Sequence, residues 1–228
     1  MSTQYIYTEK NNCQDCYKCI RECPVKAIKI ENQSASVMQD YCIYCGHCTT
    51  VCPVEAKKIR EDLGSVKYLL QNYENVMVSL APSYITDFPE YTPGQLIEVL
   101  RRLGFSAVSE TALGAEIISS KISNELPGLS EGVHVSPCCP ATVELIKKYY
   151  PQHAGALLPV DTPMLAHGKF LRKYYGNPVK IIFIGPCIAK KKEAEMNPGI
   201  IDAVLTFNKL RQWISQEGLI PEQIHPEK

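Results

Sequence analysis

Eight cysteines near the amino terminus repeat one spacing twice. The pattern C-x2-C-x2-C-x3-C-P begins at Cys13 and ends at Pro24, and it returns 29 residues later (13 to 42) from Cys42 to Pro53. The flanks repeat as well, CPVKAIKI against CPVEAKKI, which indicates a duplicated structural unit. Cysteines at these intervals wrap three corners of a [4Fe–4S] cube, so the chemistry they predict is low-potential transfer of single electrons.

The fourth ligand of each cube must come from the other copy of the pattern. In two-cluster ferredoxins the last cysteine of each run binds the cluster of the other run. We therefore predict two ligand sets: quartet one is Cys13, Cys16, Cys19 and Cys52, and quartet two is Cys42, Cys45, Cys48 and Cys23. Zinc is the alternative, but it favours paired C-x2-C knuckles separated by a longer loop. His47 is expected to be an ordinary loop residue beside the cluster, because cysteine fills every ligand position.

The composition restricts the protein class and its location. The 228 residues carry 24 basic and 24 acidic side chains, with 45% hydrophobic and 21% charged residues, as in ordinary globular proteins. A balanced charge disfavours nucleic-acid and anionic membrane partners, which need a basic excess. The first residues lack an apolar segment, and the longest uninterrupted apolar runs are only about five residues, so neither a secretory signal nor a transmembrane helix is expected. Cysteines without a signal peptide predict metal ligands in a reducing cytoplasm.

The rest of the chain alternates strands and helices. Strands are expected at 75–80, 106–110, 132–136, 179–184 and 203–207; helices are expected at 92–103, 112–122, 140–150, 162–175, from 187 onward and at 209–216. Thr92 followed by Pro93 is typical of a helix start. This alternation predicts a mainly parallel sheet with helices on both faces. The expected organisation is an α+β ferredoxin-like two-cluster domain at 1–62, a linker at 63–74, and an α/β domain at 75–228.

Three further cysteines fall at predicted junctions between a strand and a helix. Cys138 and Cys139 follow one strand, and Cys187 follows another. Ligands of open parallel sheets collect beyond the carboxyl ends of the strands, and a helix N-terminus favours the thiolate. A shared site is therefore expected, although free cysteines are commonly small buried apolar residues.

These segments resemble a known family. SPCCPATVEL at 136–145 resembles the first H-cluster signature of [FeFe]-hydrogenases, commonly TSCCP, and GPCIAKKKE at 185–193 resembles the second, commonly MPCxxKxxE. LAPSYITDF and GQLIEVLRRLGF look like the opening of that family's catalytic domain, and a tandem ferredoxin is its usual N-terminal companion. The resemblance covers nearly the whole chain in the family's order.

The resemblance implies a role for five residues. Cys139 and Cys187 match ligands of the [4Fe–4S] half of an H-cluster, and Cys138 matches the thiol that passes protons to the dinuclear iron site. Lys190 matches the lysine that holds a cyanide ligand, and Glu193 matches its nearby glutamate. Lys190 lies three residues after Cys187, on the same helix face. Without the resemblance, the KKK run at 190–192 reads as a solvated helix face.

Two departures from the family pattern shape the expected function. The third cysteine signature is absent, because no cysteine follows Cys187, so we expect an incomplete H-cluster site. A shortened chain, a partner chain that supplies the motif, or loss of the cluster explains this, and the tail QEGLIPEQIHPEK favours a chain cut short. The segment GAEIISSKI carries Glu116 as its one carboxylate, and the signatures begin SPCC and GPC. Both features resemble the proposed sensory branch of the family.

The function expected from the sequence is an iron–sulfur electron-transfer protein. Electrons would pass through two [4Fe–4S] clusters to an H-cluster-type site completed elsewhere, for hydrogen or redox sensing or in a truncated hydrogenase that is inactive as this chain alone. The expected partners are a redox protein and either a downstream signalling domain or a chain supplying the missing motif. Alternatives are a plain ferredoxin-type carrier or redox-sensing interaction protein, and a Narf-like iron–sulfur assembly factor.

Overall fold

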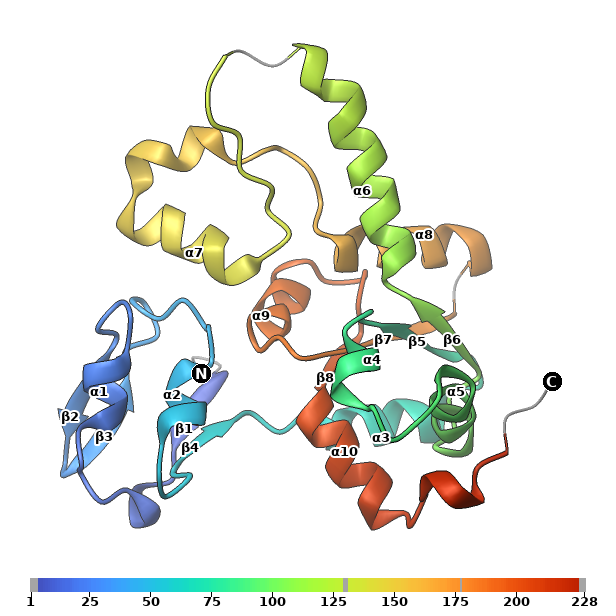
Figure 1. Ribbon diagram of the computed structural model, residues 1–228, viewed down its shortest axis with the longest axis horizontal. Coiled ribbons are helices and arrows are strands. Elements are labelled where there is room, and N and C mark those ends of the chain that lie inside the picture. Colours follow the sequence, from blue (N-terminus) through green and yellow to red (C-terminus); the bar gives the residue numbers. More distant parts are fainter. Residues whose placement is uncertain (1–3, 129–130, 177, 226–228) are drawn as a thin grey trace. The chain divides into compact units, whose positions relative to one another are not determined.

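The computed structural model describes residues 4–128, 131–176 and 178–225, which fold as two compact units (Figure 1). The first unit comprises Met1–Glu61, Cys139–Leu157 and Cys187–Glu193. The second comprises Asp62–Cys138, Leu158–Pro186 and Ala194–Lys228. The chain thus leaves and re-enters each unit, and both units draw on the segment expected as one α/β domain.

The first unit contains the duplicated cysteine pattern. In each copy the third cysteine lies in a short helix. Each of the two small sheets is a pair of antiparallel strands. The elements are β1 (Ile6–Thr8), η1 (Lys10–Asn12), α1 (Lys18–Glu22), β2 (Ile28–Glu31), β3 (Ser34–Val37), α2 (His47–Val51) and β4 (Lys57–Ile59). Strand β1 pairs with β4, and β2 pairs with β3. The α+β ferredoxin-like fold predicted from the repeat is confirmed.

Two segments from later in the chain complete the first unit. They contribute α7 (Pro140–Tyr149), η3 (Pro151–Ala156) and the start of α9 (Ala189–Met196). Ile188 and Ala189 are buried in the same apolar core as the cysteines of the repeat. The approach is close at Gly46, whose added Cβ would lie 2.7 Å from Ile188 Cδ1. Gly46 also has a φ of +82°, a backbone conformation that glycine adopts at least cost.

A four-stranded parallel sheet forms the middle of the second unit. Its strands, in spatial order, are β6 (Ala107–Glu110), β5 (Val76–Leu80), β7 (Lys180–Gly185) and β8 (Ala203–Thr206). The central strands β5 and β7 are buried along almost their whole length. Continuous apolar runs are typical of parallel strands that are covered on both faces. All three strand pairs are parallel, so the predicted parallel α/β fold is confirmed.

Helices cover both faces of this sheet (Figure 1). In this view α8 lies above the sheet with α6 packed on it, and α3, α5 and α10 lie below. The remaining elements of the unit are α3 (Leu63–Asn72), α4 (Tyr84–Asp87), α5 (Pro93–Arg102), α6 (Ala112–Glu125), η2 (Leu126–Gly128), α8 (Pro163–Tyr175), α10 (Phe207–Gln216) and η4 (Pro221–Gln223). The segment 63–74, expected as a linker, contains α3, because Leu63 and Val66 are buried in the core of this unit.

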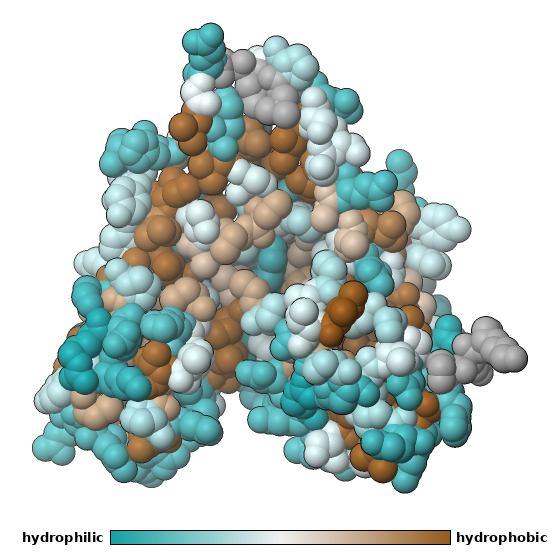
Figure 2. All heavy atoms as spheres, in the orientation of Figure 1, coloured by the Kyte–Doolittle hydropathy of each residue, from teal (hydrophilic) through white to brown (hydrophobic). Residues whose placement is uncertain are grey.

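The start of α5 agrees with its sequence signals. Thr92 accepts a hydrogen bond from the Gln95 N–H, and the Gln95 side chain accepts one from the Thr92 N–H, which forms a capping box. The helix buries its apolar side and turns Arg101 and Arg102 outward. Figure 2 shows the result as a largely hydrophilic surface over α5 and α10 at the lower right. None of the helices in the described ranges is both long enough and apolar enough to cross a membrane.

One predicted strand is wrong. Residues 132–136 form no strand, and Val135 makes only an isolated bridge, its carbonyl accepting from the Leu158 N–H at 2.9 Å. The apolar–polar alternation there resembles a strand, but β6 and β8 already form the edges of the sheet, and Val133 is 78% exposed. Without a neighbouring strand the segment lacks the ladder of hydrogen bonds that defines one. Cys138 and Cys139 therefore follow an extended loop, and not the carboxyl end of a sheet strand.

Candidate iron–sulfur sites

The two predicted cysteine quartets line two separate cavities of the first unit. Cys13, Cys16, Cys19 and Cys52 line one, which we call the cluster-one cavity. Cys23, Cys42, Cys45 and Cys48 line the other, the cluster-two cavity. Their empty volumes are nearly equal, about 340 and 310 Å³, as suits two copies of one bound group. Each cavity combines three cysteines of one copy with the last cysteine of the other.

Backbone N–H groups donate to the sulfurs at equivalent points of the two copies. The Ala27 N–H lies 3.3 Å from Cys23 Sγ, and the Ala56 N–H lies 3.2 Å from Cys52 Sγ. The Tyr44 N–H adds a third such contact, 3.3 Å from Cys42 Sγ. Donors directed at sulfur stabilise a thiolate and are a means by which proteins set the potential of a bound cluster.

The loops that carry the central cysteines adopt unusual backbone conformations. Asp15 and Tyr17 flank Cys16 with φ of 51° and 59°, and Tyr44 and Gly46 flank Cys45 with φ of 58° and 82°. Left-handed conformations at non-glycine residues cost free energy and cluster at ligand-binding loops. Their repetition at equivalent positions indicates two loops shaped to curl around a ligand.

Burial makes some of these thiols poor acids on their own. Desolvation raises the pKa of Cys48 to about 12, and it raises the pKa of Cys19 and Cys42 as well. Such thiols stay protonated at neutral pH unless a metal displaces the proton. In the described ranges no three Cys, His, Asp or Glu side chains converge on one metal ion. A [4Fe–4S] cube needs no such convergence, because each thiolate binds a different iron around a cavity. The donor set therefore fits the cube.

One cysteine from each of the two later motifs, Cys139 and Cys187, lies in the first unit near the buried Lys190. Cys139 is the N-cap residue of α7, and Cys187 lies just before α9. Desolvation raises the pKa of Cys139, but hydrogen bonds from Thr142 and Ala141 and the charge of Lys190 outweigh it and lower the pKa overall. Desolvation dominates at Cys187 and raises its pKa, with the Lys190 charge acting in the opposite direction. One lysine charge thus acts on both sulfurs.

Lys190 belongs to a buried ion pair. Its Nζ lies 2.6 Å from Glu193 Oε2, and the two side chains are 9% and 11% exposed. Lys191 is also buried, so the alternative of a solvated helix face does not describe Lys190 and Lys191. An ion pair shielded from water holds its partners in a fixed arrangement, as a ligand-orienting group requires.

Cys138 lies in the second unit, one residue before the chain enters the first. It is exposed, and its Sγ lies 2.9 Å from the Ser136 hydroxyl. A thiol beside a hydroxyl can exchange a proton with it. The proton-carrying role of Cys138 and the roles of Lys190 and Glu193 remain predictions.

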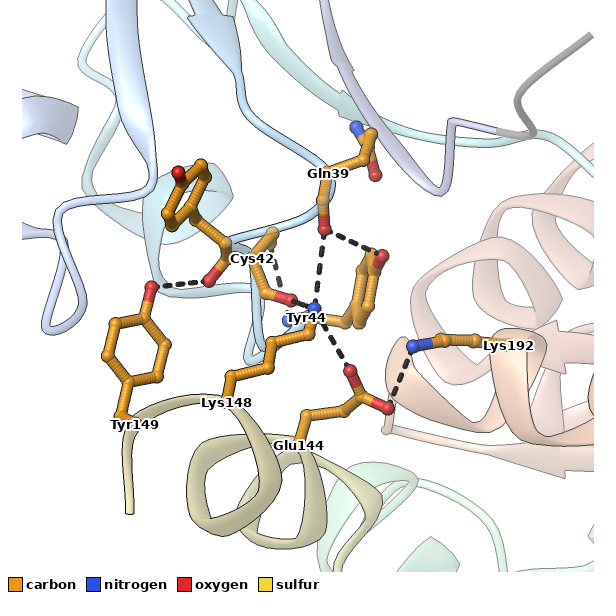
Figure 3. A network of polar contacts seen from close by, with 8 residues as sticks. Gln39, Cys42, Tyr44, Glu144, Lys148, Tyr149 and Lys192 are labelled. Atoms are coloured by element: carbon orange, nitrogen blue, oxygen red, sulfur yellow. Dashed lines mark hydrogen bonds and ion pairs between the residues drawn. The ribbon is translucent and has the colours of Figure 1, made fainter. Parts of the chain in front are cut away.

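A polar network that the sequence did not predict joins α7 and α9 to the cluster-two loop (Figure 3). Lys148 Nζ donates to the Cys42 carbonyl at 2.7 Å and pairs with Glu144 at 3.0 Å. Glu144 also pairs with Lys192 at 2.7 Å, and both lysines lie over the Tyr44 ring, at 5.2 and 5.0 Å. The i, i+4 spacing of Glu144 and Lys148 allows an ion pair along one helix, but nothing in the sequence shows that Lys148 reaches the Cys42 carbonyl.

Tyr149 makes a second connection between α7 and the repeat. Its hydroxyl lies 2.7 Å from the Tyr41 carbonyl and 3.2 Å from the Val25 carbonyl. Desolvation raises the pKa of Glu144, but hydrogen bonds from Lys192 and Lys148 outweigh it and lower the pKa overall, so this carboxylate is ionised at neutral pH. Helix α7 therefore holds the cluster-two loop by charge-assisted contacts, and the segment at the start of α9 holds it by close packing.

Comparisons with known proteins cover nearly the whole chain. Residues 74–228 match the family model described as iron only hydrogenase large subunit, C-terminal domain, and residues 5–62 match the 4Fe-4S dicluster domain. Iron hydrogenase 1 of Clostridium pasteurianum is 28% identical over 173 residues, and the match covers 65% of this chain and 30% of that protein.

Solved structures share the fold. An apo form of the [FeFe]-hydrogenase HydA1 from Chlamydomonas reinhardtii matches with a TM-score of 0.63 and 22% identity, over 74% of this chain and 51% of that chain. An [FeFe]-hydrogenase from a study of stepwise H-cluster assembly matches with a TM-score of 0.61 and 22% identity, over 74% and 50%. The chain thus spans about half the length of these structures and less than a third of the curated relative.

Proposed function

The chain belongs to the iron-only hydrogenase family, and within this family we propose that it carries electrons through two [4Fe–4S] clusters to an H-cluster-type site. Bound cubes of this kind accept and release single electrons at low potential. The protein's part is to hold eight thiolates, bury four of them and direct N–H groups at three of the sulfurs. The observation that carries the proposal is that each predicted quartet lines its own cavity.

We infer that Cys139 and Cys187 are two of the ligands of a further cube. Support comes from their position in one unit with the two quartets and from the single lysine charge that acts on both. The remaining ligands would come from residues outside these 228, because no cysteine follows Cys187. Lys190, held by Glu193, would orient a ligand of the dinuclear iron, and Cys138 would carry protons.

Sensing of hydrogen or redox state is the role we favour over turnover. A proton relay needs titratable groups in hydrogen-bond contact through the protein. Helix α6, where catalytic members carry relay glutamates, has an exposed Glu116 and, at its last residue, Glu125, which pairs with Lys121 on the surface; it buries only Gly114 and Ile118. This arrangement supports slow or absent hydrogen production and favours a signalling partner.

The redox partner is expected to approach the cluster-one side of the repeat. Cys16 and its equivalent Cys45 are both exposed, but the residues next to them differ, since Tyr17 is 47% exposed. The equivalent of Tyr17 in the second copy is the buried Gly46, which Ile188, just before α9, covers. A protein electron donor or acceptor needs close access to a cluster, and the cluster-one loop offers it.

Anaerobic reconstitution with iron and sulfide tests the proposal. We expect about eight iron atoms per chain and, after reduction, two coupled S = 1/2 signals in the EPR spectrum. Replacing Cys16 or Cys45 with serine should remove one cluster signal and leave the other, whereas Cys138→Ser should leave both. An iron content well below about eight per chain, or signals unaffected by both variants, contradicts the assignment of the quartets.

A third cube is a separate outcome of the same experiment. A signal beyond the two, lost in both Cys139→Ser and Cys187→Ser, would support assembly of the H-cluster-type site on this chain. Two signals that persist in both variants would instead support the plain electron carrier. Hydrogen turnover after addition of a synthetic dinuclear iron complex would contradict the sensing role, and we expect little or none.

A further inference from the structure

The duplicated fold provides its own comparison, because residues 29 apart occupy equivalent positions. Lys57 corresponds to Ile28, and Thr8 corresponds to Val37. The strand registers agree with this correspondence, since Thr8 pairs with Lys57 and Val37 pairs with Ile28. One copy therefore has a polar, charged pair where the other has two aliphatic side chains.

These four residues line the two cavities. Thr8 and Lys57 lie on the wall of the cluster-one cavity, and Ile28 and Val37 lie on the wall of the cluster-two cavity. Lys57 is as buried as its aliphatic counterpart, 4% exposed against 6% for Ile28. The cavities are thus nearly equal in volume and lined by equivalent residues, but one wall carries a buried positive charge.

Neutral oxygens hold the ammonium group in place. Lys57 Nζ lies 2.5 Å from Thr8 Oγ1 and 2.7 Å from the Ala35 carbonyl, and the Thr8 hydroxyl donates to the same carbonyl. Neither partner cancels the charge, and a buried ammonium is costly unless an anion lies close. The charged groups acting on it are the sulfurs of Cys19, Cys48, Cys13 and Cys52, three of which belong to quartet one.

The pKa of Lys57 reflects this competition. Desolvation lowers it from its ordinary value, and the cysteine sulfurs raise it. A bound cube with four thiolates carries a net negative charge that becomes more negative on reduction. The anion that compensates Lys57 is therefore the cluster itself.

We propose that Lys57 raises the reduction potential of cluster one above that of cluster two, so that an electron entering the repeat resides preferentially on cluster one. This inference rests on the proposed quartets. The step adds one electron from a low-potential donor, dithionite in the experiment below, and converts [4Fe–4S]²⁺ to [4Fe–4S]⁺. No proton moves, and Lys57 keeps its charge. The ammonium stabilises the reduced form because that form carries one more negative charge.

The size of the effect follows from known charge–charge coupling. An opposite charge within about 4–6 Å shifts a protonation equilibrium by one to three powers of ten. The same field acts on an added electron, so we expect a change of at least tenfold in the reduction equilibrium of cluster one. For a one-electron couple a tenfold change corresponds to about 59 mV.

An EPR-monitored redox titration of the reconstituted full chain tests the proposal. We expect two midpoint potentials in the wild type, and we expect the upper one to fall by about 59 mV or more in Lys57→Met. Lys57→Ile, which copies the other repeat, should do the same. Ile28→Lys should raise the lower midpoint, so the two kinds of change close the gap from opposite ends.

Lys58 provides the matched control. It follows Lys57 on β4, is half-buried, and has a lysine equivalent, Lys29, in the other copy. Lys58→Met removes the same formal charge but leaves the difference between Lys57 and Ile28 in place. We expect a much smaller shift of either midpoint potential. Thr8→Val, which keeps the lysine and removes one of its hydrogen bonds, should also shift the upper midpoint less than Lys57→Met does.

The outcomes separate this inference from the proposed function. A wild-type chain without about eight irons contradicts the quartets themselves. With full iron content, equal shifts in Lys57→Met and Lys58→Met, or no shift in Lys57→Met, overturn the role of Lys57. Failure of both Lys57 variants to hold two clusters also overturns it, because the lysine would then serve assembly and not potential.

Discussion

The crossing of α6 and α8 leaves no room for a side chain at Gly114. A Cβ built at this position would lie 2.1 Å from the Pro163 carbonyl oxygen and 2.8 Å from His167 Cβ. Ordinary van der Waals contact begins near 3.4 Å, so the carbonyl is too close by roughly 1.3 Å. The obstructing atoms are a backbone carbonyl oxygen and a Cβ, and neither can rotate away. Gly114→Ala must therefore push the two helices apart.

The magnitude follows from two opposing effects. Alanine favours the helix over glycine by about 1 kcal/mol. Overpacking of a tight contact costs about 1–3 kcal/mol, and more where backbone must move. We expect Gly114→Ala to lower the free energy of unfolding of the second unit by about 2 kcal/mol. Gly64 in α3 is the matched control, because nothing lies within 4 Å of its added Cβ. Gly64→Ala should raise the free energy of unfolding by up to about 1 kcal/mol.

Urea unfolding followed by tryptophan fluorescence measures both variants. Trp213 is the single tryptophan of the chain and lies in the core of the second unit, so its emission reports that unit. Opposite changes in midpoint for the two substitutions are expected. If Gly114→Ala is as stable as the wild type, the helices can separate freely, and the close approach described here is not a constraint on the fold.

Two further predictions concern a buried histidine and a partly exposed tyrosine hydroxyl. His167 is fully buried between two serine hydroxyls at 2.8 and 2.9 Å, and burial lowers its pKa to about 4, so it is neutral when folded and protonated when unfolded below about pH 6.5. The free energy of unfolding should therefore fall by about 2 kcal/mol from about pH 7.5 to about pH 5. In the same Trp213 assay, His167→Gln should not show this part of the fall. Equal pH profiles of the wild type and the variant would contradict the prediction. Tyr149→Phe removes the donor to the Tyr41 and Val25 carbonyls and should cost about 1 kcal/mol in the first unit, measured by the urea midpoint for loss of cluster absorbance. An unchanged midpoint would show that water replaces the hydroxyl at no cost.

The elements predicted correctly are those whose signals are local. Strands β5 and β7 are apolar runs, and α5 begins at a capping box, so neither needs information from distant residues. The strand expected at 132–136 failed for the opposite reason: its alternation is local, but a strand exists only with a partner, and pairing is a property of the sheet. Helix α3 was missed inside the expected linker because its few apolar residues become meaningful only against the core of the second unit.

The candidate site divides in the same way. The spacing of the cysteines predicted which four would share a cavity, because the exchange of the last cysteine follows from the duplication. The contacts of Lys148 and Lys192 were not predictable, since they depend on α7 and α9 folding with the repeat. Lys57 was visible in the sequence as the difference between CPVKAIKI and CPVEAKKI, but its significance appeared only when its burial was known.

The positions where the two copies differ show how a symmetric scaffold acquires a direction. Duplication alone would give two cavities of equal potential and equal access, between which an electron has no preferred place. Lys57 opposite Ile28 makes the walls unequal in charge. Gly46 opposite Tyr17 makes the surfaces unequal, because glycine admits Ile188 and so α9, whereas the tyrosine ring stays exposed. Both differences are compatible with the fold, since Lys57 hydrogen-bonds to Thr8 of the paired strand β1 and to the Ala35 carbonyl of β3, and the two loop residues share a left-handed backbone. Direction in the proposed electron path would thus require only a few side chains that differ between the two copies of the repeat.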